Sequence, residues 1–452
     1  MSLRNRRSEF VGKGESKMLF QNIAFFDENY KMIPNGYVAV ENKRIVYVGE
    51  IPPQGDFGEL YQGKGKLLLP GFVNSHSHTP MTLLRGYGEN MTLTQWLNHC
   101  VFPFEAHWKP TEIYYATLLG IAEMARFGIV STTDMYYFVP QIAEAFLSAG
   151  MKANLSHTIV GTYGGDFNRS PVSLETRRVY SDYHGADDGL VLIDVGLHAE
   201  YTTDEKMVRG AVNLAKELKT GIHVHLSETK EEVEGCRNRH KGFTPVQYFN
   251  RLGLFEVPVT AAHGVWLQTE DYPILQEHQV TVATCPKSNL KLACGVLPYL
   301  ALKQAGINVA LGTDSVASNN NLNMLEEMRF FALLQKEKYD DPTLVTPAEA
   351  LQTATINGSK AQRRVDCGRL AEGYRADLIV LDITSPSWQP VHHLMSNLLY
   401  SASGSDICLT MVDGQVIYRD GSYPTIDLER VYFEVEAAKK RILGELKAES
   451  AV

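Results

Sequence analysis

The segment His76-Ser77-His78 places two histidines on alternate positions at the end of a predicted strand, residues 72–77. Side chains two residues apart on a strand point to the same side, so both imidazoles can bind one ion. His225, His263 and Asp314 stand at or near the ends of three further predicted strands. Two imidazoles from one strand, a third from another and a carboxylate form an N3O ligand set. Such a set suits a borderline divalent ion such as Zn²⁺, so the sequence predicts a metal centre.

Glu228 follows His225 by three residues, at the mouth of the same strand. A carboxyl there can exchange protons with a water molecule and with a ring nitrogen of a substrate, so we predict that Glu228 is a proton shuttle. The alternative is a structural glutamate that caps the next helix. His223 shares the face of His225 but lies one layer deeper, which favours a hydrogen-bonded core role over ligation. The remaining histidines in helices or loops are interpreted as surface or packing residues: His99, His107, His184, His240, His278, His392 and His393.

The elements that carry these residues repeat one unit between Leu67 and Asp314: a helical stretch, a short apolar run, and a polar residue at its end. This order is typical of parallel βα units. Eight units predict a (β/α)8 TIM barrel over residues 71–365, in which catalytic groups gather at the carboxyl ends of strands. An open doubly wound sheet is the alternative. We also predict that Thr202 and Glu205 form a capping box. The predicted strands are 72–77, 129–134, 152–159, 190–198, 221–227, 259–263, 280–284 and 308–313.

The two flanks of the barrel have a different pattern. Residues 36–49 alternate apolar and polar positions, and residues 407–417 turn at Asp413-Gly414, a strong hairpin dipeptide. With a further strand at 376–383, these signals predict one small β-sandwich domain formed from both terminal segments, 18–70 and 366–427. The apolar spacing of residues 428–452 predicts a C-terminal packing helix.

The composition limits the classes of function. The 452 residues are 44% hydrophobic and 21% charged, with a net charge of −9, which disfavours binding to nucleic acid or an anionic membrane. No apolar run approaches the roughly 20 residues of a membrane helix. The six cysteines are scattered without a CxxC pair, which indicates reduced thiols and a cytoplasmic location. The basic segment 1–17 is interpreted as a tag or disordered extension, and a homo-oligomer is left open.

Several motifs resemble a known family. Residues 70–78 (PGFVNSHSH), 83–86 (LLRG), 225–229 (HLSET), 262–263 (AH) and 311–315 (LGTDS) are similar to the amidohydrolase superfamily, in its cytosine deaminase-like branch. Four more segments resemble the 5′-methylthioadenosine/S-adenosylhomocysteine deaminases: 134–136 (DMY), 288–292 (SNLKL), 317–320 (ASNN) and 423–427 (YPTID). The similarity covers nearly everything from Met18 to the end of the chain.

The resemblance implies a metal held by His76, His78, His225 and Asp314. Binuclear relatives carry a lysine at the end of the fourth strand, where this chain has none, so one divalent ion is expected, with Zn²⁺ favoured and Fe²⁺ or Mn²⁺ as alternatives. By the same resemblance, His263 polarises the attacking water. Glu228 moves a proton to a ring nitrogen, and Asp314 also takes part in catalysis.

The resemblance also implies contacts to a substrate. Glu105 aligns with a carboxylate that binds ribose hydroxyls, His198 with a purine contact, and Arg169 with one of two arginines for a substrate carboxylate. His157 stands where the pattern has the second arginine. This departure weakens a bidentate clamp for an anionic tail, which needs two guanidinium forks.

The expected function is therefore the hydrolytic deamination of an adenine nucleoside at C6, with adenosine, methylthioadenosine and S-adenosylhomocysteine as candidate substrates. A second hypothesis is that the protein is a deaminase or chlorohydrolase of another N-heterocycle, such as guanine, a pterin or a triazine. A third is a non-catalytic scaffold of the same fold, against which the complete metal and Glu228 set argues.

Overall fold

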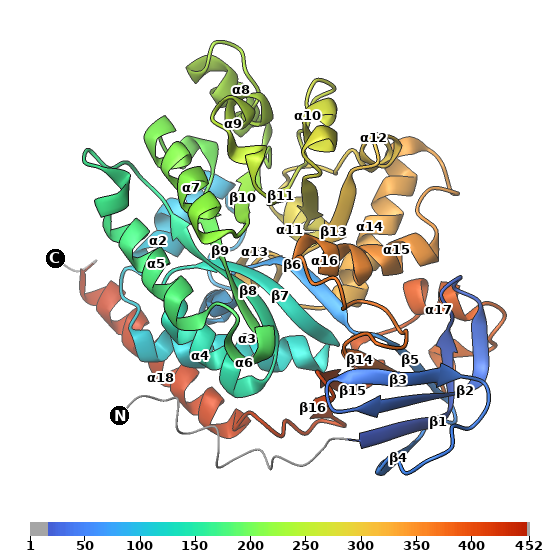
Figure 1. Ribbon diagram of the computed structural model, residues 1–452. Coiled ribbons are helices and arrows are strands. Elements are labelled where there is room, and N and C mark those ends of the chain that lie inside the picture. Colours follow the sequence, from blue (N-terminus) through green and yellow to red (C-terminus); the bar gives the residue numbers. More distant parts are fainter. Residues whose placement is uncertain (1–16, 450–452) are drawn as a thin grey trace.

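The computed structural model describes residues 17–449, and its centre is a rolled sheet of eight parallel strands in sequence order (Figure 1). The backbone N–H groups of Thr313 and Asp314 donate to the His76 carbonyl oxygen at 3.2 and 3.0 Å, which joins the last strand to the first. The sheet is thus a nearly closed barrel, which confirms the predicted TIM-barrel class over the open sheet. Its strands are β6 (Phe72–Ser77), β7 (Ile129–Tyr136), β8 (Lys152–Ile159), β9 (Val191–Leu197), β10 (Ile222–Leu226), β11 (Val259–His263), β12 (Thr281–Thr284) and β13 (Asn308–Leu311).

Helices connect and surround these strands (Figure 1). Several begin with proline at their first position, where the missing N–H group has no helical partner to lose. The helices are α1 (Leu93–Trp96), α2 (Phe102–Glu105), α3 (Pro110–Arg126), α4 (Val139–Ala149), α5 (Pro171–Tyr183), α6 (Ala186–Gly189), α7 (Glu205–Leu218), α8 (Lys230–Arg239), α9 (Pro245–Arg251), α10 (Tyr272–Glu277), α11 (Pro286–Lys291), α12 (Tyr299–Gln304), α13 (Val316–Asn319), α14 (Met324–Tyr339), α15 (Pro347–Thr353), α16 (Ile356–Ala361), α17 (Leu394–Tyr400) and α18 (Leu428–Glu449).

The predicted capping box of Thr202 and Glu205 is wrong. Helix α7 begins at Glu205, and its N-cap is Asp204, whose carboxylate accepts from the backbone N–H of Met207 at 2.8 Å. Thr202 ends a preceding 3₁₀ turn instead. An aspartate directly before the helix supplies the same acceptor from a closer position, so the threonine is not needed as a cap.

A second sheet joins the two ends of the chain. In Figure 1 the blue N-terminal strands lie beside the red C-terminal ones, and the strand order is β16-β15-β14-β5-β1-β2-β3, with β4 paired to β1. This sheet has its own apolar cluster, separate from the barrel core. The predicted composite of both termini is therefore present, while the domain boundaries remain predictions. The strands are β1 (Lys17–Phe26), β2 (Met32–Glu41), β3 (Arg44–Gly49), β4 (Glu59–Gln62), β5 (Lys66–Pro70), β14 (Leu378–Asp382), β15 (Ile407–Val412) and β16 (Gln415–Arg419).

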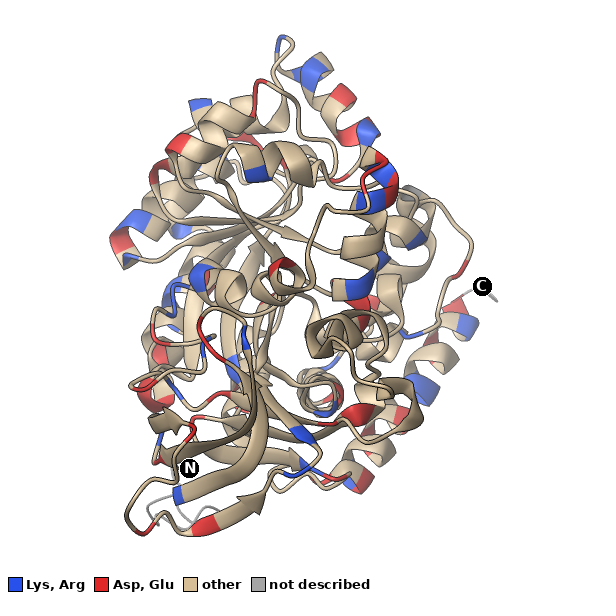
Figure 2. Ribbon diagram, turned by 90° about the vertical axis from the view of Figure 1, so that its right-hand side faces the viewer, with Lys and Arg blue, Asp and Glu red and all other residues tan. Residues whose placement is uncertain are grey.

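Helix α18 ends the described chain and packs against α3. Its Val431 and Ile442 are buried, and the Arg441 Nε donates to Glu112 Oε1 at 2.7 Å. The predicted extension 1–17 lies outside the described residues except for Lys17, which begins β1, and residues 450–452 lie outside them too. Between residues 17 and 449, no helix combines the length and apolar composition that a bilayer span requires. Basic and acidic positions are intermixed over the side shown in Figure 2.

Candidate metal centre and active site

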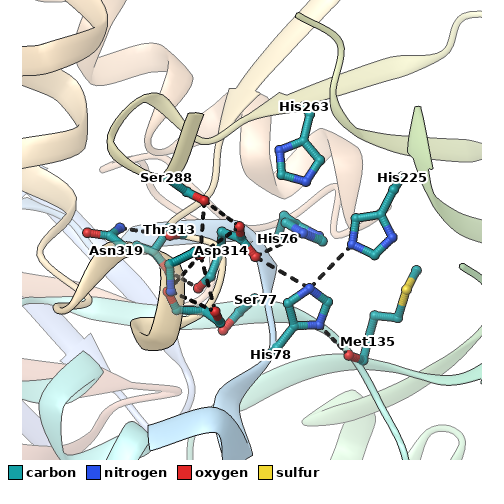
Figure 3. A network of polar contacts seen from close by, with 12 residues as sticks. His76, Ser77, His78, Met135, His225, His263, Ser288, Thr313, Asp314 and Asn319 are labelled. Atoms are coloured by element: carbon teal, nitrogen blue, oxygen red, sulfur yellow. Dashed lines mark hydrogen bonds and ion pairs between the residues drawn. The ribbon is translucent and has the colours of Figure 1, made fainter. Parts of the chain in front are cut away.

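Four predicted ligands meet at the carboxyl ends of the barrel strands. The Nε2 atoms of His78 and His225 are 3.3 Å apart. The Asp314 Oδ1 lies 3.4 Å from His78 Nε2 and 3.6 Å from His76 Nε2. Figure 3 shows these side chains facing a common centre, with His263 beside it. The fold therefore brings together the whole predicted ligand set from β6, β10 and the residues after β13.

The hydrogen bonds made by Nδ1, the ring nitrogen that points away from the centre, determine which nitrogen of each imidazole carries the hydrogen. The Nδ1 of His78 lies 2.6 Å from the Met135 carbonyl oxygen, and the Nδ1 of His225 lies 2.7 Å from the His198 carbonyl oxygen. A carbonyl oxygen only accepts, so both Nδ1 atoms carry the hydrogen. Burial holds the pKa of His225 well below its usual value, so this ring is neutral and its Nε2 presents a lone pair to the centre.

His76 completes the arrangement from deeper in the barrel. Its Nδ1 is 2.9 Å from the Nε2 of His223, and burial lowers the pKa of His76 to about 3. Its Nε2 is buried and has no hydrogen-bond partner within the part of the chain that the structure describes. His223 therefore contacts the candidate ligand His76, and its supporting role stays a prediction.

The donor set fits a divalent cation. With the hydrogens of both rings on Nδ1, the Nε2 atoms of His78 and His225 turn their lone pairs toward a common centre, which suits a cation. Asp314 supplies the anionic oxygen, and its other oxygen, Oδ2, accepts from Ser288 Oγ at 2.6 Å and Ser318 Oγ at 2.9 Å. Three imidazole nitrogens and one carboxylate oxygen match the preferences of zinc.

Glu228 and His263 stand beside this centre. Glu228 is 7% exposed, and its Oε2 lies 3.8 Å from the His263 Nε2. Burial raises the pKa of Glu228, whereas the carboxylates of Glu228 and Asp314 outweigh burial at His263 and raise its pKa. The His263 Nδ1 contacts Asn289 Oδ1 at 3.0 Å. The pair can therefore hold and transfer a proton next to the metal ligands.

One cavity is lined by three of the candidate metal ligands, His78, His225 and Asp314, and by Glu228. Two of the predicted substrate residues, Glu105 and His198, line the same cavity. The Tyr136 hydroxyl donates to Glu105 Oε1, and burial raises the pKa of Glu105 to about 7. The His198 Nδ1 lies 2.9 Å from Thr202 Oγ1, and burial lowers the pKa of His198 to about 4. A wall of apolar side chains from α1, α2 and the π-helical turn between them covers the cavity: Leu93, Trp96, Leu97, Val101 and Phe102.

Comparison with known proteins gives the family. A model described as the amidohydrolase family matches residues 67–417. This chain belongs to the amidohydrolase family. It is 37% identical over 429 residues, 94% of this chain and 99% of the relative, to a protein of Thermoanaerobacter pseudethanolicus named 5-methylthioadenosine/S-adenosylhomocysteine deaminase.

Two further relatives of this amidohydrolase are informative. A protein of Methanothermobacter thermautotrophicus named 5'-deoxyadenosine deaminase is 38% identical over 91% of this chain and 96% of its own length. The crystal structure of an adenosine deaminase from Xanthomonas campestris with bound zinc superposes with a TM-score of 0.88. It is 29% identical and covers 95% of this chain and 99% of its own.

Two predicted substrate residues of this amidohydrolase do not line the cavity. Arg169 is exposed at the end of a 3₁₀ turn after β8. His157 lies on β8 next to Thr158, which does line the cavity, so strand alternation turns His157 to the other side. Its ring lies near Tyr137, and burial lowers its pKa. The structure therefore brings together Glu105 and His198, and leaves His157 and Arg169 apart from them.

A further cluster of metal-ligating residue types in the amidohydrolase consists of Glu200, Cys236 and His240. The Glu200 carboxylate already accepts from Arg239 Nε at 3.1 Å and from His240 Nε2 at 2.6 Å. These bonds satisfy the carboxylate and fix the loop that carries His198. The carboxylate of this cluster is therefore already paired with cationic or hydrogen-donating side chains.

Some functional partners were not predicted from the sequence. Tyr136, Asn289, Ser288 and Ser318 all lie within motifs that carried the family resemblance, but the motifs alone assigned them no contact. Tyr136 ends β7, whereas the other three lie in the short helices α11 and α13 that follow β12 and β13. In the fold each one orients Glu105, His263 or Asp314.

Proposed function

We propose that this protein is a metal-dependent hydrolytic deaminase that acts at C6 of an adenine nucleoside and releases ammonia. The observation that carries the proposal is the layout of one cavity. The same cavity is lined by the imidazole and Asp314 centre with Glu228 and by a carboxylate–tyrosine pair, Glu105 and Tyr136, whose tyrosine ring centroid lies 6.3 Å from that of His78. The first group suits attack on a purine ring, and the second suits the adjacent hydroxyls of a ribose.

The residues that would hold the ion are His76, His78, His225 and Asp314, and we propose Zn²⁺, with Fe²⁺ or Mn²⁺ as alternatives. A divalent ion at this place supplies Lewis acidity, which makes water acidic enough to react near neutral pH.

The chain's own groups then move the protons. Glu228 accepts a proton from the attacking water and donates it to N1 of the purine, which makes C6 electrophilic. His263, paired with Asn289, orients the water at C6. After the water oxygen has bonded to C6, Asp314 relays the remaining proton to the exocyclic amine. The C6–N bond breaks, ammonia leaves as a neutral molecule, and the product is the inosine analogue.

We propose that Glu105 binds the ribose hydroxyls and that His198 contacts the purine. We also propose that the apolar side chains over the cavity make the main contacts with the group at the 5′ position. Leu93, Trp96 and Phe102 offer a surface for a methylthio or deoxy group. Arg169, the predicted contact for an anionic tail, and His157, which stands where the family pattern has a second arginine, lie outside the cavity lining. Neutral nucleosides should therefore be at least as good substrates as S-adenosylhomocysteine. The six cysteines are free thiols, which fits a reducing compartment such as the cytoplasm.

The test is ammonia release from the zinc-loaded protein over a panel of adenosine, methylthioadenosine, S-adenosylhomocysteine, guanine and a triazine. We expect turnover of the nucleosides, with kcat/KM for methylthioadenosine equal to or above that for S-adenosylhomocysteine. Turnover of guanine or the triazine alone would contradict the nucleoside assignment. A strong preference for S-adenosylhomocysteine would contradict the proposal that apolar side chains recognise the 5′ substituent.

A further inference from the structure

The first turn of α8 contains a buried carboxylate that the deamination steps above do not use. Glu232 is 5% exposed. Its Oε1 accepts from the backbone N–H of Ser227 at 2.8 Å, and its Oε2 accepts from the backbone N–H of Glu228 at 2.7 Å. Both carboxylate oxygens thus bind consecutive amides of the turn that carries the proton shuttle.

These contacts differ from ordinary helix capping. Thr229 is the N-cap of α8, and its Oγ1 accepts from the Glu232 N–H at 3.1 Å. In a capping box the acidic side chain at the third helical position returns to the N-cap amide. The Glu232 side chain instead reaches one and two residues farther upstream, to Glu228 and Ser227. The carboxylate therefore acts on the active-site turn rather than on the helix end.

The turn needs such support because its backbone is unusual. Ser227 has φ of 51°, in the left-handed region that a non-glycine residue enters at some energetic cost. Its backbone N–H donates to the Glu232 carboxylate, and its carbonyl oxygen accepts from the backbone N–H of Trp266 at 2.8 Å. With both sides of this residue fixed, the next residue, Glu228, leaves the turn in one direction, toward His263.

We propose that Glu232 is a positioning residue that aims the Glu228 carboxylate at the reacting atoms. The inference rests on the proposed function, since it assigns Glu232 a role in the proton transfer that Glu228 performs. A bidentate carboxylate is required because two N–H donors must be accepted at once. A glutamine has one acceptor oxygen, and its NH2 group would face an N–H donor.

The first test compares Glu232→Gln with Glu231→Gln, a matched control because Glu231 is an exposed neighbour on the same helical turn. Misplacement of a catalytic group by about 1 Å costs on the order of 100-fold in rate. We expect Glu232→Gln to lower kcat by about 100-fold with KM and metal content near wild type, and Glu231→Gln to leave all three unchanged. A Glu232→Gln protein with wild-type kcat would overturn the proposal.

Glu232→Asp keeps the charge at the α8 N-terminus but shortens the side chain by one methylene, so it cannot reach both amides. It tests the same idea if Glu232→Gln folds poorly. We expect a folded, metal-loaded protein with reduced kcat and a larger solvent isotope effect, because proton transfer becomes slower. Wild-type kcat in this variant would count against positioning.

The decisive comparison is a double-mutant cycle with Glu228→Gln. If Glu232 acts through Glu228, adding Glu232→Gln to Glu228→Gln leaves the residual kcat unchanged. If Glu232 acts independently of Glu228, the two losses in kcat multiply, which would overturn the proposal. If Glu232 only stabilises the fold, kcat per folded molecule is unchanged in the single variant, which would overturn it as well. The substrate is whichever compound of the panel the wild type deaminates fastest, so failure of the nucleoside assignment is seen separately, in the wild type.

Discussion

The two ends of the same barrel each bury a cluster of polar and charged side chains, but the clusters differ in how well they are satisfied. At the amino-terminal ends of the strands, the Lys152 ammonium donates to both Asp377 and Asp413. Arg364 donates to the carbonyl oxygens of Ala153 and Leu190, each at 3.1 Å. Burial opposes the charge of Lys152, yet the two carboxylates raise its pKa above the usual value. Within residues 17–449, none of these charged side chains has a buried polar atom without a partner.

At the carboxyl-terminal ends the balance is reversed. The Nε2 atoms of His78 and His225 face each other, and the His76 Nε2 has no hydrogen-bond partner in the described chain. The three rings have their outer nitrogens bonded, so the inner ones are left for a ligand. The comparison teaches that burial alone does not mark function: a satisfied cluster stabilises the fold, whereas an organised but unsatisfied one prepares a binding site.

The largest effect is expected from His225→Ala, which removes one inner nitrogen from the unsatisfied end. We expect loss of the bound metal and of all measurable turnover. The fold should be retained, because the Lys152 cluster at the other end of the barrel is untouched. Metal content by plasma mass spectrometry and ammonia release check this. A His225→Ala protein that keeps one metal equivalent would show that the ligand set is misassigned.

His223→Ala gives the graded version of the same test. His223 contacts His76 Nδ1, so if its role is to orient that ring we expect metal affinity to fall by about 10–100-fold without being lost. Competition with a chelator measures the affinity. Complete loss of metal, as severe as in His225→Ala, would instead make His223 a ligand.

Glu228→Gln separates chemistry from metal binding at this end. General acid–base catalysis contributes about 10²–10⁴-fold, so we expect kcat to fall by that factor while one metal equivalent remains bound. The measurement is steady-state ammonia release alongside metal analysis of the same preparation. Normal turnover in this variant would refute the shuttle role of Glu228.

Lys152→Met probes the satisfied end. The substitution leaves the buried Asp377 carboxylate without a cation and Asp413 with Arg375 alone, at 3.4 Å. This loss should cost about 3–5 kcal/mol of unfolding free energy. Activity per folded molecule should stay at the wild-type level. Urea denaturation and kcat on the native fraction test both statements. A variant as stable as the wild type, or one that folds but loses activity, would contradict the view that the Lys152 cluster serves stability and the histidine cluster serves function.

The smallest effect is a pH dependence of substrate binding. Because burial raises the pKa of Glu105 to about 7, the carboxylate is charged above that pH and neutral below it. Only the charged form accepts bonds from both ribose hydroxyls, so KM for a nucleoside should rise as pH falls through 7. Glu105→Gln should raise KM by about 10–100-fold and flatten this profile. An unchanged profile in Glu105→Gln would exclude the ribose contact.

The fold could be predicted largely from local patterns. The bounds predicted for β6, β8 and β11 match the structure, because parallel strands buried on both faces form compact apolar runs with polar residues at their ends. The candidate metal ligands were predicted from the same signal, since catalytic groups of a barrel stand where strands end.

The contacts that orient those ligands could not be predicted in this way. Lys152 and Asp377 are 225 residues apart in the chain, so no local pattern links them. The hydrogen bond from the Ser227 N–H to Glu232 depends on a left-handed turn. The hydrogen bond from Tyr136 to Glu105 depends on where α2 packs over β7. Such contacts are set by the tertiary fold.

The most direct test of the account is a titration of metal-free protein with Zn²⁺, in which the rate of ammonia release from methylthioadenosine is followed against metal occupancy. We predict that the rate rises in proportion to occupancy and saturates at one equivalent per chain. Full activity in the chelated, metal-free protein, or a requirement for two equivalents, would contradict the account.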